Sequence, residues 1–122
     1  ILPDVISKEP LAPLVRHGDQ RFTDLLRWIH FGLLTAEELG ITQANVAQAA
    51  TGDNRPDAQR LLGRTGDLGR MLGVDNAFMV NIVRNIGNYG EIFQRNLGPI
   101  GLQRGPNALW NQGGLQYAPP FR

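Results

Sequence analysis

The chain contains no cysteine, and it has a single serine, Ser7, and a single lysine, Lys8. Without cysteine it can form neither a disulfide bond nor a thiolate metal site. A cysteine-free chain also suits the oxidising periplasm. Ser7 lacks a Gly-x-Ser-x-Gly setting, which argues against a hydrolase nucleophile. The glycine-spaced segment 63–73 has no lysine and does not match a phosphate-binding P-loop.

Long hydrophobic runs and an excess of one charge are absent as well. No apolar run is long enough to span a bilayer. Twelve basic residues face 11 acidic ones, and the arginines are scattered, so no stripe for nucleic-acid phosphates is present. With 122 residues and 42% hydrophobic content, the chain fits one domain with a small core. It opens with Ile1-Leu2-Pro3-Asp4, which resembles neither an initiator methionine nor a signal peptide and indicates the interior of a longer protein.

Glycine and proline, by contrast, are plentiful, with 15 and 8 copies, and they favour several short helices with marked ends. Prolines at three positions predict an extended segment over 1–18, because proline lacks a backbone donor and disfavours helix before it. Within it, 11–17 is the best strand candidate. A lone strand leaves its backbone groups unpaired, so this one needs a partner from another segment or another chain.

Two long helices are predicted. The first runs over 20–39 with Asp19 as N-cap and Gly40 as terminator, and its wide apolar face indicates burial on more than one side. The second runs over 76–97 with Asp75 as N-cap, and Gly87 and Gly90 interrupt it, marking a kink or a close helix contact.

Shorter helices are predicted between and after the long ones. They cover 43–50, capped by Thr42, then 56–62 with proline in the first turn, and a single turn ending at Leu72. The tail 99–122 reads as an extended strap with one helical turn over 107–112. The expected fold of the chain is therefore mainly α with one or two short strands.

No group of residues points to catalysis or to metal binding. His17 and His30 lie thirteen positions apart across a predicted strand and a helix, a poor arrangement for shared metal ligation. Acidic residues, which include an adjacent pair that must diverge on a helix, are better read as solvated surface: Glu37, Glu38, Asp53, Asp57 and Asp67. Aromatic residues at helical spacing favour core over a stacking platform: Trp28, Phe78, Tyr89, Phe93 and Trp110. We expect no enzyme, no cofactor and no metal.

Several segments together resemble a known family. The order of strand, Gly-Asp, long helix and Gly-x-Tyr-x-x-Ile helix (Gly87 to Ile92) is similar to the last part of the amino-acid-binding proteins of bacterial ABC importers. The similarity is greatest to the general L-amino-acid-binding branch. It rests on Lys8-Glu9-Pro10-Leu11, Val15-Arg16-His17-Gly18-Asp19, Ala36-Glu37-Glu38-Leu39-Gly40, Thr42-Gln43-Ala44-Asn45-Val46, Asn107-Ala108-Leu109-Trp110, Gly113-Gly114-Leu115 and Tyr117-Ala118-Pro119-Pro120-Phe121-Arg122.

The resemblance implies a parent fold of two α/β lobes that close around a ligand by hinge bending. Residues 1–10 would be the hinge return, residues 11–98 the C-terminal completion of the first lobe, and 99–122 a tail. The family's ligand-binding arginine and acidic residue would lie upstream of Ile1. Arg16, Arg84 and Arg104 are therefore not assigned to the ligand, and no high-affinity binding by this chain alone is expected.

The resemblance also implies a periplasmic protein that captures polar amino acids for an ABC permease. An alternative interpretation is a free-standing helical interaction module. In that case the orphan strand at 11–17 and the wide apolar face of the first helix would pair with a second copy in an intertwined homodimer. A piece with an exposed sheet edge and core face is expected to self-associate in either case.

Overall fold

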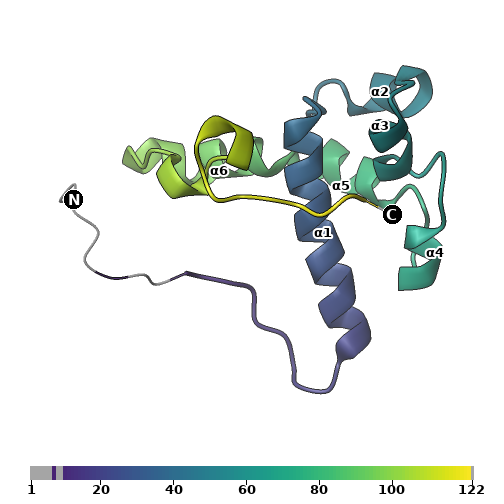
Figure 1. Ribbon diagram of the computed structural model, residues 1–122, viewed down its shortest axis with the longest axis horizontal. Helices are drawn as coiled ribbons and strands as arrows, with labels where there is room; N and C mark the ends of the chain where they lie inside the picture. The colour runs from purple at the N-terminus through teal and green to yellow at the C-terminus, as the bar shows by residue number, and fades with distance from the viewer. Residues whose placement is uncertain (1–6, 8–9, 122) are drawn as a thin grey trace.

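The structure is a computed structural model that describes residue 7 and residues 10–121. It is mainly helical, as predicted, and the long helix α1 (Gln20–Glu38) is its central element. Helices α3 to α6 each contact α1, and α2 packs on α5 (Figure 1). Residues 10–121 contain no β-strand, and a single isolated bridge between Leu109 and Gln116 is the nearest approach to one.

Helix α1 begins and ends close to the predicted positions. Its N-cap is Asp19, whose Oδ1 accepts a hydrogen bond from the backbone N–H of Phe22 at 3.0 Å. This bond satisfies one of the donors that a helix start leaves free. After Leu39 the chain passes through Gly40 at a φ of +69°, a conformation that glycine adopts without steric cost.

Three short helices follow, α2 (Val46–Gly52), α3 (Pro56–Leu61) and α4 (Leu68–Leu72). All three were predicted, but α2 begins three residues later than expected. Thr42 does not cap it. Instead Asn45 organises the loop before it, accepting from the Thr42 N–H at 2.7 Å and donating to the Gly40 carbonyl at 2.9 Å. These bonds favour a turn over 42–45 and delay the helix.

The prediction of one long helix over 76–97 is wrong. The segment forms two helices, α5 (Phe78–Ile86) and α6 (Tyr89–Leu97). Gly87 breaks the ladder with φ 82° and ψ −176°, and Asn88 then caps a new helix. The start is also later than predicted, because Asp75 accepts from the Ala77 N–H at 2.7 Å and holds a turn before α5.

The strand expected over 11–17 does not form either. Leu11–Arg16 carry no regular structure and His17 opens a turn. Figure 1 shows this segment leading away from the helices, so it has no neighbouring strand to pair with. A strand needs such a partner to satisfy its backbone groups. The predicted hinge return over 1–10 lies almost entirely outside the described residues.

The core gathers around the C-terminal half of α1. Its members come from every helix except α6 and from the tail: Leu33, Ala36, Ile41, Val46, Ala58, Leu61, Leu62, Leu72, Phe78, Met79, Val80, Val83 and Phe121. The tail contributes three 3-10 turns, η1 (Gly98–Ile100), η2 (Gly105–Asn107) and η3 (Trp110–Gln112), then crosses α1 towards the C-terminus (Figure 1). At its end Phe121 is buried, stacked on Phe78 and edge-on to Trp28.

Candidate functional site

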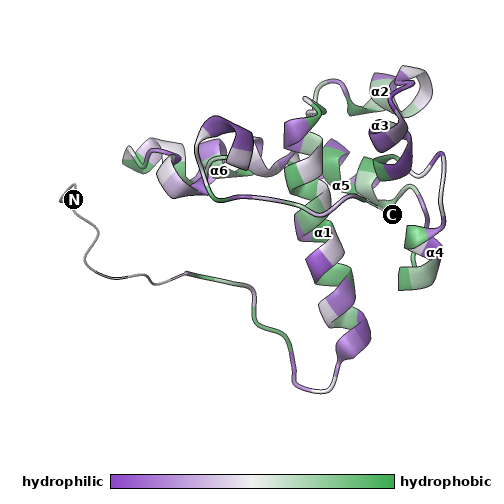
Figure 2. Cartoon of the chain, in the orientation of Figure 1, coloured by the Kyte–Doolittle hydropathy of each residue, from purple (hydrophilic) through white to green (hydrophobic). Residues whose placement is uncertain are grey.

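The two halves of α1 differ in burial. The fully buried positions of this helix lie at Gly32 and beyond, in its C-terminal half. The N-terminal half projects past the other helices (Figure 2). There Phe22 is 47% exposed, and Leu26 is half-buried but lies outside the core cluster. The predicted burial on more than one side is therefore met only by the C-terminal half.

The segment that precedes α1 is also uncovered and apolar. Leu11 and Leu14 are 97% and 96% exposed. Together with Phe22 and Leu26 they form what we call the uncovered surface. Burying apolar area is favourable by roughly 25 cal/mol per Å², so apolar side chains that the described helices leave uncovered or half-covered, on this segment and on the first turns of α1, favour contact with another piece of protein.

A polar junction fixes the opposite side of the molecule, where α5 and α6 meet the loop after α1. Asn88 and Glu91 form a capping box at the start of α6. Glu91 also accepts from the Gln43 N–H at 3.0 Å, and the buried Asn88 donates to the Ile41 carbonyl at 3.0 Å. The Gln43 amide donates to the carbonyls of Arg84 and Asn85 near the end of α5.

A second junction attaches the tail to α1 and α6. Arg104 donates two bonds to the Glu37 carboxylate, at 2.9 and 3.1 Å, and two to the Asn107 carbonyl. Its guanidinium also lies 5.3 Å from the ring centre of Tyr89 and 5.2 Å from that of Phe93. The geometry combines a bidentate ion pair with cation–π contacts. Arg104 is thus occupied in holding the tail.

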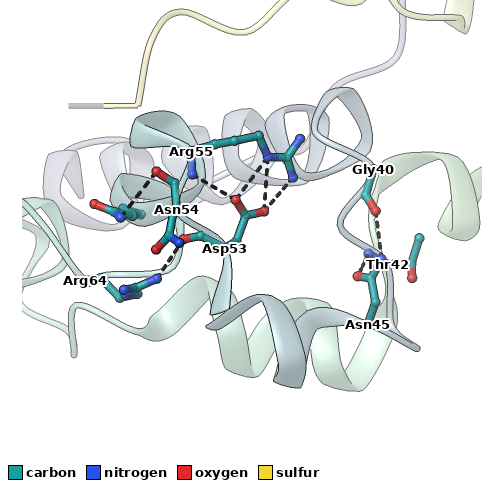
Figure 3. Close-up of polar contacts among 8 residues, drawn as sticks. Gly40, Thr42, Asn45, Asp53, Asn54, Arg55 and Arg64 are labelled. Atoms are coloured by element: carbon teal, nitrogen blue, oxygen red, sulfur yellow. Dashed lines mark hydrogen bonds and ion pairs between the residues drawn. The ribbon is translucent and has the colours of Figure 1, made fainter. Parts of the chain in front are cut away.

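A third polar group closes the loop between α2 and α3 (Figure 3). Asp53 accepts from the Arg55 side chain, with a shortest distance of 2.6 Å, and from the Arg55 N–H, while Arg64 donates to the Asp53 carbonyl. The hydrogen bonds from Arg55 lower the pKa of Asp53 to about 2. All partners in this group lie within residues 53–64, so these bonds hold the loop and α3 together locally and have a structural role.

The residues considered from the sequence do not converge on a reaction centre. Arg16 is exposed in the segment before α1, and Arg84 is exposed on α5. His30 is half-buried edge-on to Tyr89, and this burial lowers its pKa, whereas His17 is exposed. Within residue 7 and residues 10–121, no three histidine, cysteine or acidic residues are grouped to hold a metal ion.

The acidic residues and the aromatics separate into different roles. Glu37 pairs with Arg104, while Asp53, Asp57 and Asp67 each pair with a nearby arginine. Among the aromatics, Phe78 and Phe93 are buried, Trp28 and Tyr89 are partly buried, and Trp110 is 53% exposed. The core interpretation is correct for four of the five, and Trp110 departs from it.

Relatives cover the whole chain at high identity. It is 53% identical over 125 residues to the glutamate/glutamine/aspartate/asparagine-binding protein BztA of Rhodobacter capsulatus. It is 51% identical over 127 residues to the general L-amino acid-binding periplasmic protein AapJ of Rhizobium johnstonii, and 50% identical to the putative amino-acid ABC transporter-binding protein YhdW of Escherichia coli K12. Over its full length, the chain is homologous to the amino-acid-binding proteins of ABC transporters. The resemblance inferred from the sequence is confirmed.

The homology concerns one part of these binding proteins. The chain spans 37% of the length of each of these three relatives. An ABC transporter periplasmic binding protein from Brucella ovis, solved with glutathione bound, superposes on 99% of the chain with a TM-score of 0.92 and 52% identity, and the match takes up 39% of that structure. The helical arrangement described above is therefore the same in a solved binding protein. No protein-family model matches the chain.

No helix in the part of the chain that the structure describes is long and apolar enough to cross a membrane. The structure also reveals polar residues that the sequence interpretation missed, namely Gln43, Asn45, Asn88 and Glu91. A local signal was available for two of them. Asn88 followed three residues later by Glu91 is the spacing of a capping box, and it marks a helix start inside a segment that apolar periodicity alone reads as continuous. Gln43 acts through contacts with residues more than 40 positions away, and Asn45 holds the local turn after α1; neither carries such a signal.

Proposed function

We propose that the chain forms part of a periplasmic solute-binding protein that captures polar L-amino acids for an ABC importer. The observation that carries this proposal is the full-length homology to binding proteins of this transporter class. The names of BztA and AapJ associate those proteins with amino acids, and the name of AapJ with the periplasm. In this role the parent protein delivers its ligand by changing shape, without chemistry on the substrate.

Within such a parent we assign residues 1–10 to the hinge return, 11–98 to the completion of one lobe, and 99–122 to a tail. The uncovered surface supports this division. Leu11, Leu14, Phe22 and Leu26 would pack against the remainder of the lobe, which would also supply the strand neighbour that 11–17 lacks. In this arrangement α1 would lie between the other helices of the chain and the rest of the lobe.

The residues that bind the ligand belong, in this proposal, to the part of the parent outside this chain. Arg104 is committed to Glu37 and to two aromatic rings, so it is not available to a ligand carboxylate. Arg84 has its side chain on the exposed face of α5, and its backbone carbonyl accepts a hydrogen bond from the Gln43 side chain. The chain on its own therefore binds no amino acid with high affinity and performs no catalysis.

Isothermal titration calorimetry of the 122-residue chain with the polar amino acids tests the binding part of this proposal. We expect no saturable heat. A dissociation constant in the micromolar range or tighter would overturn it, since on the order of −8 kcal/mol of binding free energy requires a largely complete site.

A second candidate function is self-association, and the exposure of Leu11, Leu14 and Phe22 favours it. A second copy would cover the same apolar area that the rest of a lobe would cover. Light scattering over a concentration series tests this: we expect a dimer mass that Phe22→Asp returns to the monomer mass. A monomer mass at all concentrations would contradict it.

A further inference from the structure

A groove on the side of the molecule where the tail crosses α1 is separate from the uncovered surface. Its volume is about 400 Å³, within the range of small-ligand sites. Three elements line it. The end of α1 contributes Glu38, helix α3 contributes Asp57 and Arg60, and the tail contributes Trp110, Tyr117 and the strap 118–121.

Two aromatic side chains form one wall of this groove. The rings of Trp110 and Tyr117 lie edge to face, with centroids 6.2 Å apart. A backbone bond from the Trp110 N–H to the Gln116 carbonyl, 2.9 Å long, holds the two together. They remain 53% and 61% exposed, so the core does not use them. Two aromatic rings at an angle present electron-rich faces, which attract cations.

The charged side chains that line the groove carry a net negative charge, which is the sign that attracts a cation. Asp57 pairs with Arg60 at 3.3 Å, and these two charges offset each other. Glu38 has no ion-pair partner among residue 7 and residues 10–121, and it leaves the lining with one net negative charge. Pro119 and Pro120 offer no backbone N–H to the groove, and the Arg60 guanidinium that also lines it is paired with Asp57. A quaternary ammonium carries no N–H group, so it needs no hydrogen-bond acceptors from the groove and fits this chemistry.

We propose that the groove between the end of α1, helix α3 and the tail binds a small organic cation of the alkylammonium class. Trp110 and Tyr117 contact the alkyl groups around the cationic centre, and Glu38 supplies the opposite charge. The site lies within this chain, so it is independent of the amino-acid site proposed for the parent protein.

Choline, titrated into the 15N-labelled 122-residue chain and followed by NMR, tests this proposal. The chain has two tryptophans, and Trp28 is packed against Phe31 and Phe121, so the Trp110 indole signal reports on the groove separately. We expect saturable shifts at Trp110 and Tyr117, with a dissociation constant on the order of 1 mM for a contact of this size. The uncharged isostere 3,3-dimethyl-1-butanol should bind at least about fivefold more weakly.

Matched variants separate the contributions of ring and charge. Trp110→Ala and the conservative Glu38→Gln are each expected to weaken choline binding roughly fivefold. Asp24→Asn removes an exposed carboxylate outside the groove, so it should leave the binding unchanged. The absence of saturable shifts, equal binding of the alcohol, or unchanged binding by Glu38→Gln would each overturn the proposal.

Discussion

Gly90 lies against the carboxyl group of Glu37 so closely that a Cβ at position 90 would come within 2.9 Å of it. The same Cβ would be 3.0 Å from Nη1 of Arg104. The glycine in the first turn of α6 thus leaves the space in which the ion pair between α1 and the tail is made. This close approach explains a glycine that helix propensity alone disfavours.

Replacing this glycine tests the close approach. Gly90→Ala should lower the free energy of unfolding, although alanine is intrinsically better in a helix by about 1 kcal/mol. The penalty should vanish when Arg104→Met is also present, because the ion pair no longer needs the space. Gly52→Ala in α2 is the control, since a Cβ there meets no atom within 4 Å. Urea denaturation of the native chain, the two single variants and the double variant gives the coupling free energy between positions 90 and 104. A Gly90→Ala variant that is more stable than the native chain would contradict this explanation of the glycine.

Breaking the ion pair itself should be costly. Glu37 and Arg104 side chains are only 12% and 25% exposed, so Arg104→Met leaves a largely buried carboxylate unpaired. We expect a loss of about 1–3 kcal/mol in the free energy of unfolding. Arg27→Met breaks the exposed pair with Asp24 and should cost less than about 0.5 kcal/mol. Equal costs for the two variants would show that the tail is not held in this way.

Asn88 has two functions that one pair of substitutions can separate. Its Oδ1 caps α6 and its Nδ2 donates to the buried Ile41 carbonyl. Asn88→Asp keeps the cap and loses the donor, whereas Asn88→Ala loses both. We expect the alanine variant to be destabilised by about 2–3 kcal/mol, the sum of a cap and a buried hydrogen bond, and the aspartate variant to fall between it and the native chain when measured by urea denaturation. An alanine variant as stable as the native chain would contradict this assignment.

Phe121 anchors the end of the tail. It is 4% exposed and packs between Trp28 and Phe78. Phe121→Ala should cost about 3–5 kcal/mol, the usual range for emptying a buried aromatic site, and it should change the fluorescence of Trp28. Leu115→Ala in the same tail is the control, because Leu115 is 79% exposed. A small effect of Phe121→Ala on thermal unfolding would mean that the strap is not packed into the core.

Stability should also depend on the charge of His30. Burial lowers the pKa of His30 below its ordinary value of 6.5, so the folded state favours the neutral ring. The unfolded state takes up the proton first as pH falls. The contribution of His30 is therefore present above pH 6.5 and lost as pH falls below it. Unfolding free energies measured from pH 8 to 5 should decline less steeply in His30→Gln than in the native chain or in His17→Gln.

The sequence predicted much of the local structure because the relevant signals are local. Asp19 and Gly40 delimit α1 through short-range bonds and backbone freedom, and both act as expected. The apolar periodicity across Gly87 is misleading, because α5 supplies core residues and the partly buried Tyr89 and Ile92 of α6 pack against that core, although the helix is broken between them. The extended segment 11–17 needed a partner that apolar pattern alone cannot supply.

Contacts between residues far apart in the sequence could not be predicted from the sequence alone. Arg104 and Glu37 are 67 positions apart, and nothing near either residue indicates the other. Likewise the exposed pair Trp110 and Tyr117 becomes adjacent only through the turn of the tail. Tertiary structure was needed to show that Arg104 is committed to the fold and that Trp110 is not.

We propose that this chain is an interchangeable part of an amino-acid-binding protein and that it binds no amino acid by itself. A chimera tests it most directly: the matching 125 residues of BztA are replaced by this chain, and binding of glutamate is measured by calorimetry beside BztA and the isolated chain. We predict that the chimera binds glutamate within about tenfold of BztA, or about 1.4 kcal/mol, and that the isolated chain does not bind. A folded chimera without glutamate binding, or an isolated chain that binds as tightly as BztA, would contradict the account.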